Sequence, residues 1–245
     1  TCVDSTFRCR PFRGYYLCIL TESTSTMNTY QDLTHTQSFI ICAFYTLYYH
    51  ENALRLKESI ERFSINFHIR EVKDRGYWEA NTRIKPEFLL ECLERFPEQN
   101  ILYIDTDACI KNELSFFDTI QEDICIYDTQ LAPGMSHQYL ASTIFLKNTP
   151  NTKELVRQWI ANQTGGITMV DQDSLDKAML QMKGQISIKP LPEGYIKIFD
   201  RNHYQGTVYI EQYQASRQMP KLRRRLIRLR NAGLILLLVF LIGLP

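Results

Sequence analysis

Apolar residues along the middle of the chain follow two spacings that alternate. Runs of β-branched and aromatic residues at 38–46, 65–74 and 100–110 are typical of buried strands. Between these runs, 50–63 and 85–96 place apolar residues three or four positions apart, the spacing of a helix that buries one face. Strand, helix, strand, helix, strand is the order of a parallel α/β fold, which we therefore predict.

The pattern continues beyond residue 110 with more irregular spacing. It predicts strands at 124–128 and 142–148 and helices at 151–161 and 171–182. Two further apolar segments, at 186–192 and 195–199, are expected to complete the core. The segment DTQLAPGMSHQYL, between the first two of these strands, is a loop of a length that often carries function. We expect a single folded domain over residues 36–210.

Both ends of the chain differ from this domain. The first 26 residues show neither a helical nor a strand period, and we expect a poorly ordered N-terminal extension over residues 1–35. Residues 211–245 form a tail that is first basic and then apolar, and 220–245 hold six Lys and Arg and no acid. The last 14 residues carry no charge and would span roughly 21 Å as a helix, less than the ~30 Å hydrocarbon core of a bilayer. We expect peripheral contact with an anionic membrane through 221–245; a core segment of a longer chain and a terminal artefact are the alternatives.

Composition and charge narrow the class of protein. The chain has 245 residues, 44% apolar and 22% charged, which excludes a disordered, collagen-like or disulfide-stapled protein. The net charge of +1 arises because the basic tail offsets a middle section with more acids than bases. Such a middle section excludes a nucleic-acid binder, since phosphate attraction dominates that kind of affinity. Seven cysteines without a Cys-x-x-Cys pair predict free thiols and a cytoplasmic protein, on the cytosolic face of a membrane if the tail binds one.

The sharpest chemical signal is Asp105-Thr106-Asp107, which directly follows the apolar run ILYI. In α/β sheets, ligands bind beyond the carboxyl ends of strands, so both carboxylates can turn toward one ligand. They repel each other unless a cation lies between them, and oxygen ligands of this kind suit Mg²⁺ or Mn²⁺ together with substrate phosphates. The alternative is a pair of solvated acids in a turn.

The segment ILYIDTDACI resembles the metal-binding Asp-x-Asp segment of GT-A-fold, nucleotide-sugar-dependent glycosyltransferases. The order of the surrounding segments is similar too: SFIICAFYT, LKESIERF and WEANTRIK come before it, and STIFLKNT, a Trp-bearing helix, DQDSL, LPEGY and NHYQG come after it. The similarity covers roughly residues 36–206. More narrowly, the chain resembles the compact glycosyltransferase domain at the front of a larger chlorovirus glycan-synthesis protein. It implies a GT-A fold, a Rossmann-like and mainly parallel sheet flanked by helices, and a viral protein of glycan biosynthesis.

The resemblance implies a role for each matching residue. Asp107 would ligate Mn²⁺ or Mg²⁺ directly, Asp105 would ligate it too or bind the donor's ribose or sugar, and His203 would be the third protein ligand. Asp171 would hydrogen-bond the hydroxyls of the donor sugar, and Gln172 would lie near its anomeric carbon. The alternatives are an exposed loop position for the histidine and a helix cap for the acids at the start of 171–182.

Four further residues would bind the donor by the same resemblance. Lys85 would be a partner of the donor or of a carboxylate, with Arg83 beside it, although a solvated first helical turn is the alternative. Tyr45 and Thr46 would contact a uracil ring, unless Tyr45 only fills the core. The chain departs from the family pattern after Gly206, where Thr207-Val208 stand in place of the Lys-Pro-Trp that often follows.

The implied activity is a divalent-metal-dependent, hexosyltransferase-type glycosyltransferase. It would move a sugar from a nucleoside diphosphate, a UDP-sugar above all, to a hydroxyl of a glycan or glycoprotein acceptor. Retention of configuration is expected, because DQD and His203 resemble retaining enzymes. Two rivals are an Asp-x-Asp phosphatase or phosphotransferase, and a membrane-associated protein that binds a sugar nucleotide without turnover.

Overall fold

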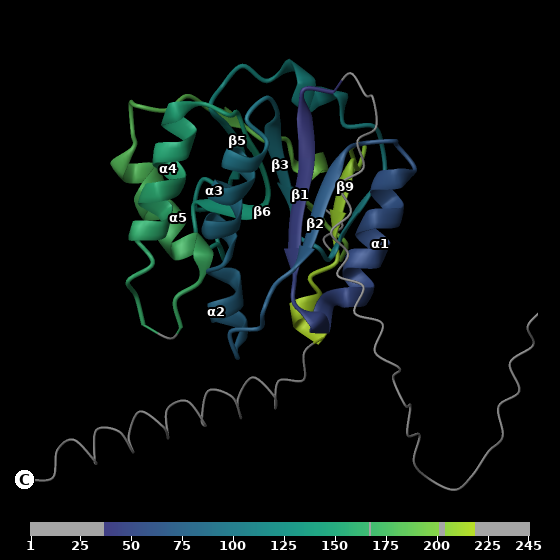
Figure 1. Ribbon diagram of the computed structural model, residues 1–245, viewed down its shortest axis with the longest axis horizontal. Helices are drawn as coiled ribbons and strands as arrows, with labels where there is room; N and C mark the ends of the chain where they lie inside the picture. The colour runs from purple at the N-terminus through teal and green to yellow at the C-terminus, as the bar shows by residue number, and fades with distance from the viewer. Residues whose placement is uncertain (1–36, 167, 201–203, 219–245) are drawn as a thin grey trace, which may run out of the picture.

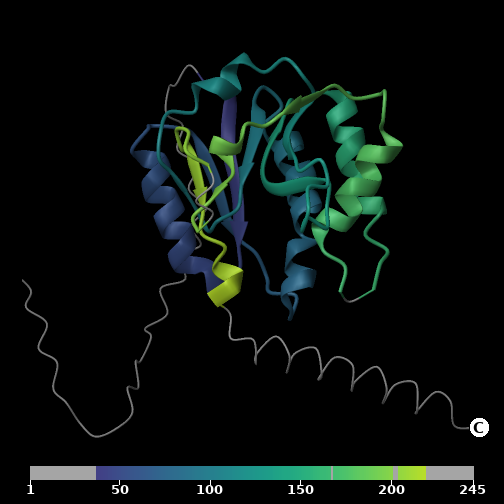
Figure 2. The same cartoon turned by 180° about the vertical axis from the view of Figure 1, so that it is seen from behind.

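The computed structural model describes residues 37–166, 168–200 and 204–218. In this part of the chain a central sheet is covered by helices on both faces (Figures 1 and 2). The sheet contains β2 (Phe67–Glu71), β1 (Phe39–Tyr45), β3 (Asn100–Ile104), β6 (Tyr139–Leu146), β5 (Ile124–Asp128) and β7 (Ile188–Pro190), in that order. The predicted α/β fold class is confirmed.

The sheet is parallel apart from β6, which runs antiparallel to both of its neighbours, β3 and β5. The predicted order of strand, helix and strand accounts for the parallel part, because parallel strands need a crossover connection. The loop between β5 and β6 contains no crossover helix, so the chain returns beside the strand that it has just left, in the opposite direction.

Two cores lie on the two faces of the sheet. One face is covered by α1 (His50–Glu61), which buries Ala53, Leu56 and Ile60 as its spacing predicts. The other face is covered by α3 (Lys85–Arg95), α4 (Pro150–Ala161) and α5 (Asp171–Gln181), and Trp159 of α4 is its largest fully buried side chain. The remaining helical segments are short: η1 (Leu47–Tyr49), α2 (Trp78–Thr82), η2 (Ser115–Thr119), η3 (Glu193–Tyr195) and η4 (Ala215–Gln218).

A second, smaller sheet differs from what the apolar runs predict. The run at 100–110 is not one strand: β3 ends at Ile104, the chain turns, and β4 (Ala108–Ile110) joins β9 (Ile210–Gln212) and β8 (Lys197–Ile198). The predicted domain boundary at residue 210 therefore falls inside β9, and the described fold extends to residue 218. Three residues of β9 are too few for a strand period to stand out in the sequence.

Three expectations fall wholly or partly outside the described residues. The N-terminal extension, His203 and the basic and apolar tail beyond residue 218 lie outside the described ranges. Within the described ranges, Cys42, Cys92, Cys109 and Cys125 are free thiols. No helix in the described ranges has the length and apolar character needed to span a bilayer.

His68 of β2 makes the stability of this fold depend on pH. Its side chain is 2% exposed, its ring stacks on Phe88 with centroids 5.9 Å apart, and its Nε2 meets no hydrogen-bond partner in the described part of the chain. Burial, reinforced by the nearby charges of Arg95 and Arg70, lowers the pKa of His68 to about 4. The folded protein therefore keeps this imidazole neutral at pH values where the unfolded chain already binds a proton.

We expect the unfolding free energy to fall as the pH drops below about 6.5, the usual pKa of histidine. At pH 5 the contribution of His68 to this loss is on the order of 2 kcal/mol, from about 1.4 kcal/mol for each pH unit between the two pKa values. Urea unfolding of wild type and His68→Phe at pH 7.5 and pH 5 measures it. The variant should lose less stability on acidification; equal losses would contradict the assignment.

Candidate active site

A cavity of about 370 Å³ opens at the carboxyl ends of β1 and β3. This is the edge of the sheet where α/β proteins bind ligands. Strand ends, the helix N-termini of α3 and α5, and the last described segment of the chain all contribute to it. The lining residues used below are Tyr45, Thr46, Tyr49, Lys85, Tyr103, Asp105, Asp107, Asp171, Gln172, Gln212, Gln214 and Ser216.

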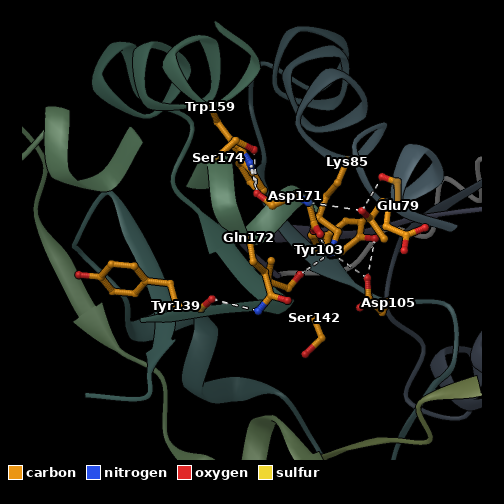
Figure 3. A network of polar contacts seen from close by, with 12 residues as sticks. Glu79, Lys85, Tyr103, Asp105, Tyr139, Ser142, Trp159, Asp171, Gln172 and Ser174 are labelled. Carbon is orange, nitrogen blue, oxygen red and sulfur yellow. Dashed lines mark hydrogen bonds and ion pairs between the residues drawn. The ribbon is translucent and has the colours of Figure 1, made fainter. Parts of the chain in front are cut away.

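Lys85 joins the carboxylates of the cavity into one buried network (Figure 3). Its Nζ lies 2.7 Å from Asp171 Oδ2 and 3.2 Å from Asp105 Oδ1, and it donates a hydrogen bond of 2.9 Å to Ala141 O. The lysine is 5% exposed, so the alternative of a solvated first turn is wrong. Burial by itself lowers the pKa of Lys85, but the facing Asp105 and Asp171 outweigh it and raise the pKa above its usual value. The ammonium stays charged.

The main chain around Asp171 holds this residue at the N-terminus of α5. Trp159 Nε1 and Ser174 Oγ both donate to Asp171 O, at 2.8 and 2.9 Å, and the side chain of Asp171 is 5% exposed (Figure 3). A carboxylate in this position is favoured by the positive end of the helix dipole. The alternative of a simple cap applies to its neighbour Asp173, whose Oδ2 accepts a hydrogen bond of 2.8 Å from Val170 N. Asp171 instead faces Lys85 and the cavity.

Asp105 sits where β3 ends and is held from two sides. Tyr103 Oη donates to Asp105 Oδ1 at 2.8 Å, on the same oxygen that faces Lys85. Burial in the cavity raises the pKa of Asp105 to about 6, with the charges of Asp107 and Asp171 adding to the rise and Lys85 opposing it. Burial also raises the pKa of Tyr103 well above its usual value, so the phenol remains a donor. The site carries more negative charge than Lys85 offsets.

Asp107 is held by a segment that no sequence signal pointed to. Ala215 N donates to Asp107 Oδ2 at 2.6 Å, and Tyr213 N donates to Asp107 O at 3.0 Å. Beside them, Gln212 is 2% exposed and donates from Nε2 to Thr143 Oγ1 at 2.9 Å, which ties β9 to β6. Burial raises the pKa of Asp107, and the Ala215 hydrogen bond opposes that rise.

The other predicted site residues divide into three groups. Gln172 lines the cavity, and its Nε2 donates to Tyr139 O at 3.1 Å (Figure 3), which orients the amide. Tyr45 and Thr46 also line the cavity, and Tyr45 is 2% exposed, so its ring fills the core as well. Arg83 is not among the residues that line the cavity; it follows the last residue of α2, and its Nη2 donates to Tyr77 Oη at 2.8 Å.

The donor set at the strand end fits a divalent cation. Among the described residues no group of three His, Cys, Asp or Glu side chains is placed to hold a metal ion, and the predicted third ligand, His203, is not described. Asp105 and Asp107 are two carboxylates at one strand end in an acidic cavity, and Asp105 has a raised pKa that a cation would reverse. Mg²⁺ and Mn²⁺ commonly bind through one or two carboxylates plus the oxygens of a phosphate substrate and water.

Searches with the sequence found no match, whereas comparison of the structure with solved structures found similar folds. No protein-family model matches the chain, and no curated protein matches it. A solved glycosyltransferase involved in glycosylation of the major capsid of PBCV-1 superimposes with a TM-score of 0.60 at 13% identity, covering 78% of this chain and 98% of that one. The chain has the GT-A fold.

A second solved structure supports this assignment. The apo form of the glycosyltransferase GlyE of Streptococcus pneumoniae TIGR4 superimposes with a TM-score of 0.52 at 14% identity, over 72% of this chain and 54% of that one. The predicted resemblance to a chlorovirus glycosyltransferase is thus confirmed as a resemblance of fold. At this level of identity the fold alone is shared, so the chemistry has to be argued from the side chains of the cavity.

Proposed function

We propose that this protein is a glycosyltransferase that moves a sugar from a nucleoside-diphosphate donor to an acceptor hydroxyl on a glycan or glycoprotein. The proposed donor is a UDP-sugar. The observation that carries the proposal is the network of Lys85 with Asp105 and Asp171 at the floor of the cavity. It joins the strand-end acid of a GT-A fold to a second acid from a helix 66 positions further along the sequence. A fold shared with solved glycosyltransferases supports the class of reaction.

In the proposed reaction, Asp105 and Asp107 would hold Mn²⁺ or Mg²⁺ against the diphosphate. The bound cation would supply charge neutralisation for the leaving diphosphate as the glycosidic C–O bond breaks. Tyr103 and Lys85 orient Asp105, and the backbone N–H of Ala215 orients Asp107, so neither carboxylate has to be ordered when the donor arrives. Preorganisation of this kind lowers the cost of binding.

Asp171 and Gln172 would contact the sugar half of the donor. Lys85 forms an ion pair with Asp171, and a carboxylate accepts hydrogen bonds from sugar hydroxyls. The amide of Gln172 is anchored through its nitrogen to Tyr139 O, so the position of its carbonyl oxygen is defined relative to the start of β6. An oriented carbonyl dipole beside the anomeric carbon would stabilise the positive charge that develops there. Retention is proposed from the resemblance of DQD to the corresponding segment of retaining enzymes.

The charges of the cavity predict that donor binding requires a cation. Among the described lining residues, Lys85 is the only basic side chain, and three carboxylates, those of Asp105, Asp107 and Asp171, line the same cavity. A diphosphate entering without a cation meets a net negative site. We expect UDP to bind at least about tenfold more tightly with Mn²⁺ or Mg²⁺ than in chelator, a difference of about 1.4 kcal/mol.

Calorimetry with UDP and with uridine, each in metal and in chelator, tests whether the cation acts through the diphosphate of the ligand. Uridine has no diphosphate, so its affinity should be the same with and without the cation. Equal UDP affinity in chelator and in metal would contradict the proposed role of the two acids. Incubation of a UDP-sugar with metal then distinguishes an enzyme from a binding protein, since a glycosyltransferase slowly hydrolyses its donor. Release of phosphate from a simple ester, with no turnover of the sugar nucleotide, would favour a phosphatase instead.

A further inference from the structure

Two polar side chains at the wall of the cavity have no partner in the described part of the chain. Gln214 and Ser216, which stand on either side of Ala215, both line the cavity. No hydrogen bond or ion pair links either side chain to another described residue. The other two glutamines of the cavity differ, because Gln172 and Gln212 each donate from Nε2 to β6. The amide of Gln214 and the hydroxyl of Ser216 are therefore free to bind a ligand.

These two residues lie next to Asp107, one of the two proposed metal ligands. Tyr213 N donates to Asp107 O at 3.0 Å, and Ala215 N donates to Asp107 Oδ2 at 2.6 Å. Gln214 stands between these two donors in the sequence, and Ser216 directly follows the second. A diphosphate bound to a cation at Asp107 would therefore lie next to the segment that carries both free side chains.

The backbone at Gln214 has a conformation that is unfavourable for glutamine. Its φ is +50°, in the left-handed region, where the Cβ of a non-glycine residue is crowded. Such strain persists where the surrounding structure imposes it, and it is concentrated at ligand sites. Here the two hydrogen bonds to Asp107 impose the turn, and Arg217 N donates to Gln214 O at 2.9 Å within it. The turn keeps Ala215 on Asp107 while Gln214 stays at the cavity wall.

The charges of the cavity favour neutral donors at this position. Lys85 is the only basic side chain among the described lining residues, and it is paired with Asp105 and Asp171. A diphosphate in this cavity is therefore left with the cation and with uncharged N–H and O–H groups. An amide and a hydroxyl supply such groups, and hydrogen bonds to a charged acceptor are stronger than those between neutral groups.

We propose that Gln214 Nε2 and Ser216 Oγ donate hydrogen bonds to the diphosphate of the donor. This assignment rests on the proposed function and extends it to the segment between β9 and η4, for which the sequence gave no signal. The two side chains bind the leaving group and do not ligate the cation. They present the positive ends of N–H and O–H dipoles to phosphate oxygens, in a cavity whose carboxylates repel those oxygens.

Calorimetry of the full chain with UDP and with uridine, both in Mn²⁺, tests this assignment. Gln214→Gly removes the amide, and the variant should fold, because glycine adopts the left-handed conformation without crowding. We expect it to bind UDP about tenfold more weakly, the effect of losing one hydrogen bond to a charged group, and to bind uridine as tightly as wild type does. Gln130→Gly is the matched control, because Gln130 has a φ of +51°, is exposed and lies outside the cavity lining. It should leave both affinities unchanged.

Two further variants separate the side chain from the backbone. Gln214→Met keeps the length of the side chain and the left-handed residue but removes the amide, so it should show the same loss of about tenfold. Ser216→Ala should also weaken UDP binding and leave uridine binding unaffected. A loss in Gln214→Gly that is absent in Gln214→Met would overturn the proposal, because the effect would then run through the backbone that holds Asp107. Equal losses for UDP and uridine would overturn it as well, since the amide would then bind the nucleoside.

Failure of this assignment and failure of the proposed function are distinct results. Wild-type affinity for UDP in all three variants, with binding still strengthened by Mn²⁺, would refute the assignment alone. Weaker UDP binding by the variants of a protein that never hydrolyses a UDP-sugar would refute the proposed activity alone. A wild-type protein that does not bind UDP in Mn²⁺ would refute both.

Discussion

Replacing Asp107 with Asn is expected to lower sugar transfer by about a hundredfold or more, equivalent to roughly 2.7 kcal/mol of transition-state stabilisation. The melting temperature of the metal-free protein should hold or rise. The amide keeps the size of the side chain and an oxygen for the hydrogen bond from Ala215 N, but removes a negative charge. Because burial raises the pKa of Asp107, that charge is costly in the folded protein when no cation is bound.

The diagnostic result for Asp107→Asn is a large fall in sugar transfer together with an unchanged or higher melting temperature of the metal-free protein. The matched control is Asp118→Asn, since Asp118 of η2 is exposed, lies outside the cavity lining and accepts hydrogen bonds of 2.9 Å from Ser38 N and Oγ. This control should keep transfer and lose a little stability. Transfer by Asp107→Asn close to the wild-type rate would mean that Asp107 does not ligate a metal, and the proposed function would lose one of its two carboxylate ligands.

Replacing Lys85 with Met should abolish measurable transfer and destabilise the fold by about 3 kcal/mol. Removal of one partner from a buried ion pair leaves the other charge uncompensated, which costs about 3–5 kcal/mol. The lower figure applies because only Asp171 is deeply buried, whereas the Asp105 side chain is 34% exposed to the cavity and is partly screened. Chemical unfolding of wild type and variant gives the stability change.

A double variant keeps this prediction testable even if Lys85→Met folds poorly. Lys85→Met with Asp171→Asn removes the uncompensated charge, so it should regain at least half of the lost stability and none of the lost transfer. Lys197→Met is the control, because Lys197 is 7% exposed, does not itself line the cavity and donates to Ile198 O. If the double variant is no more stable than Lys85→Met, the network does not hold the acids as proposed.

Local pattern was sufficient for the elements that bury one clear face. Helix α1 buries the positions that its spacing predicts, and α3 buries Phe88, Leu89, Cys92 and Leu93. The pattern failed where elements are short. Helix α2 has five residues and β9 has three, so neither completes enough of a period to stand out from its surroundings. The break between β3 and β4 falls at Asp105-Thr106-Asp107, and β4 has only three residues, so the pattern did not separate it from β3.

By itself the sequence determined the α/β class, the acids at the end of the third strand, and the residues that resemble a GT-A site. These follow from periodicity, which records whether one position faces the core, and from motif order. Only the tertiary structure showed that Lys85 forms an ion pair with Asp171. It also showed that the backbone N–H of Ala215 donates a hydrogen bond to Asp107, and that Arg83 donates one to Tyr77. Contacts between segments so far apart depend on how whole layers pack, and no local spacing encodes which strand end will meet which helix.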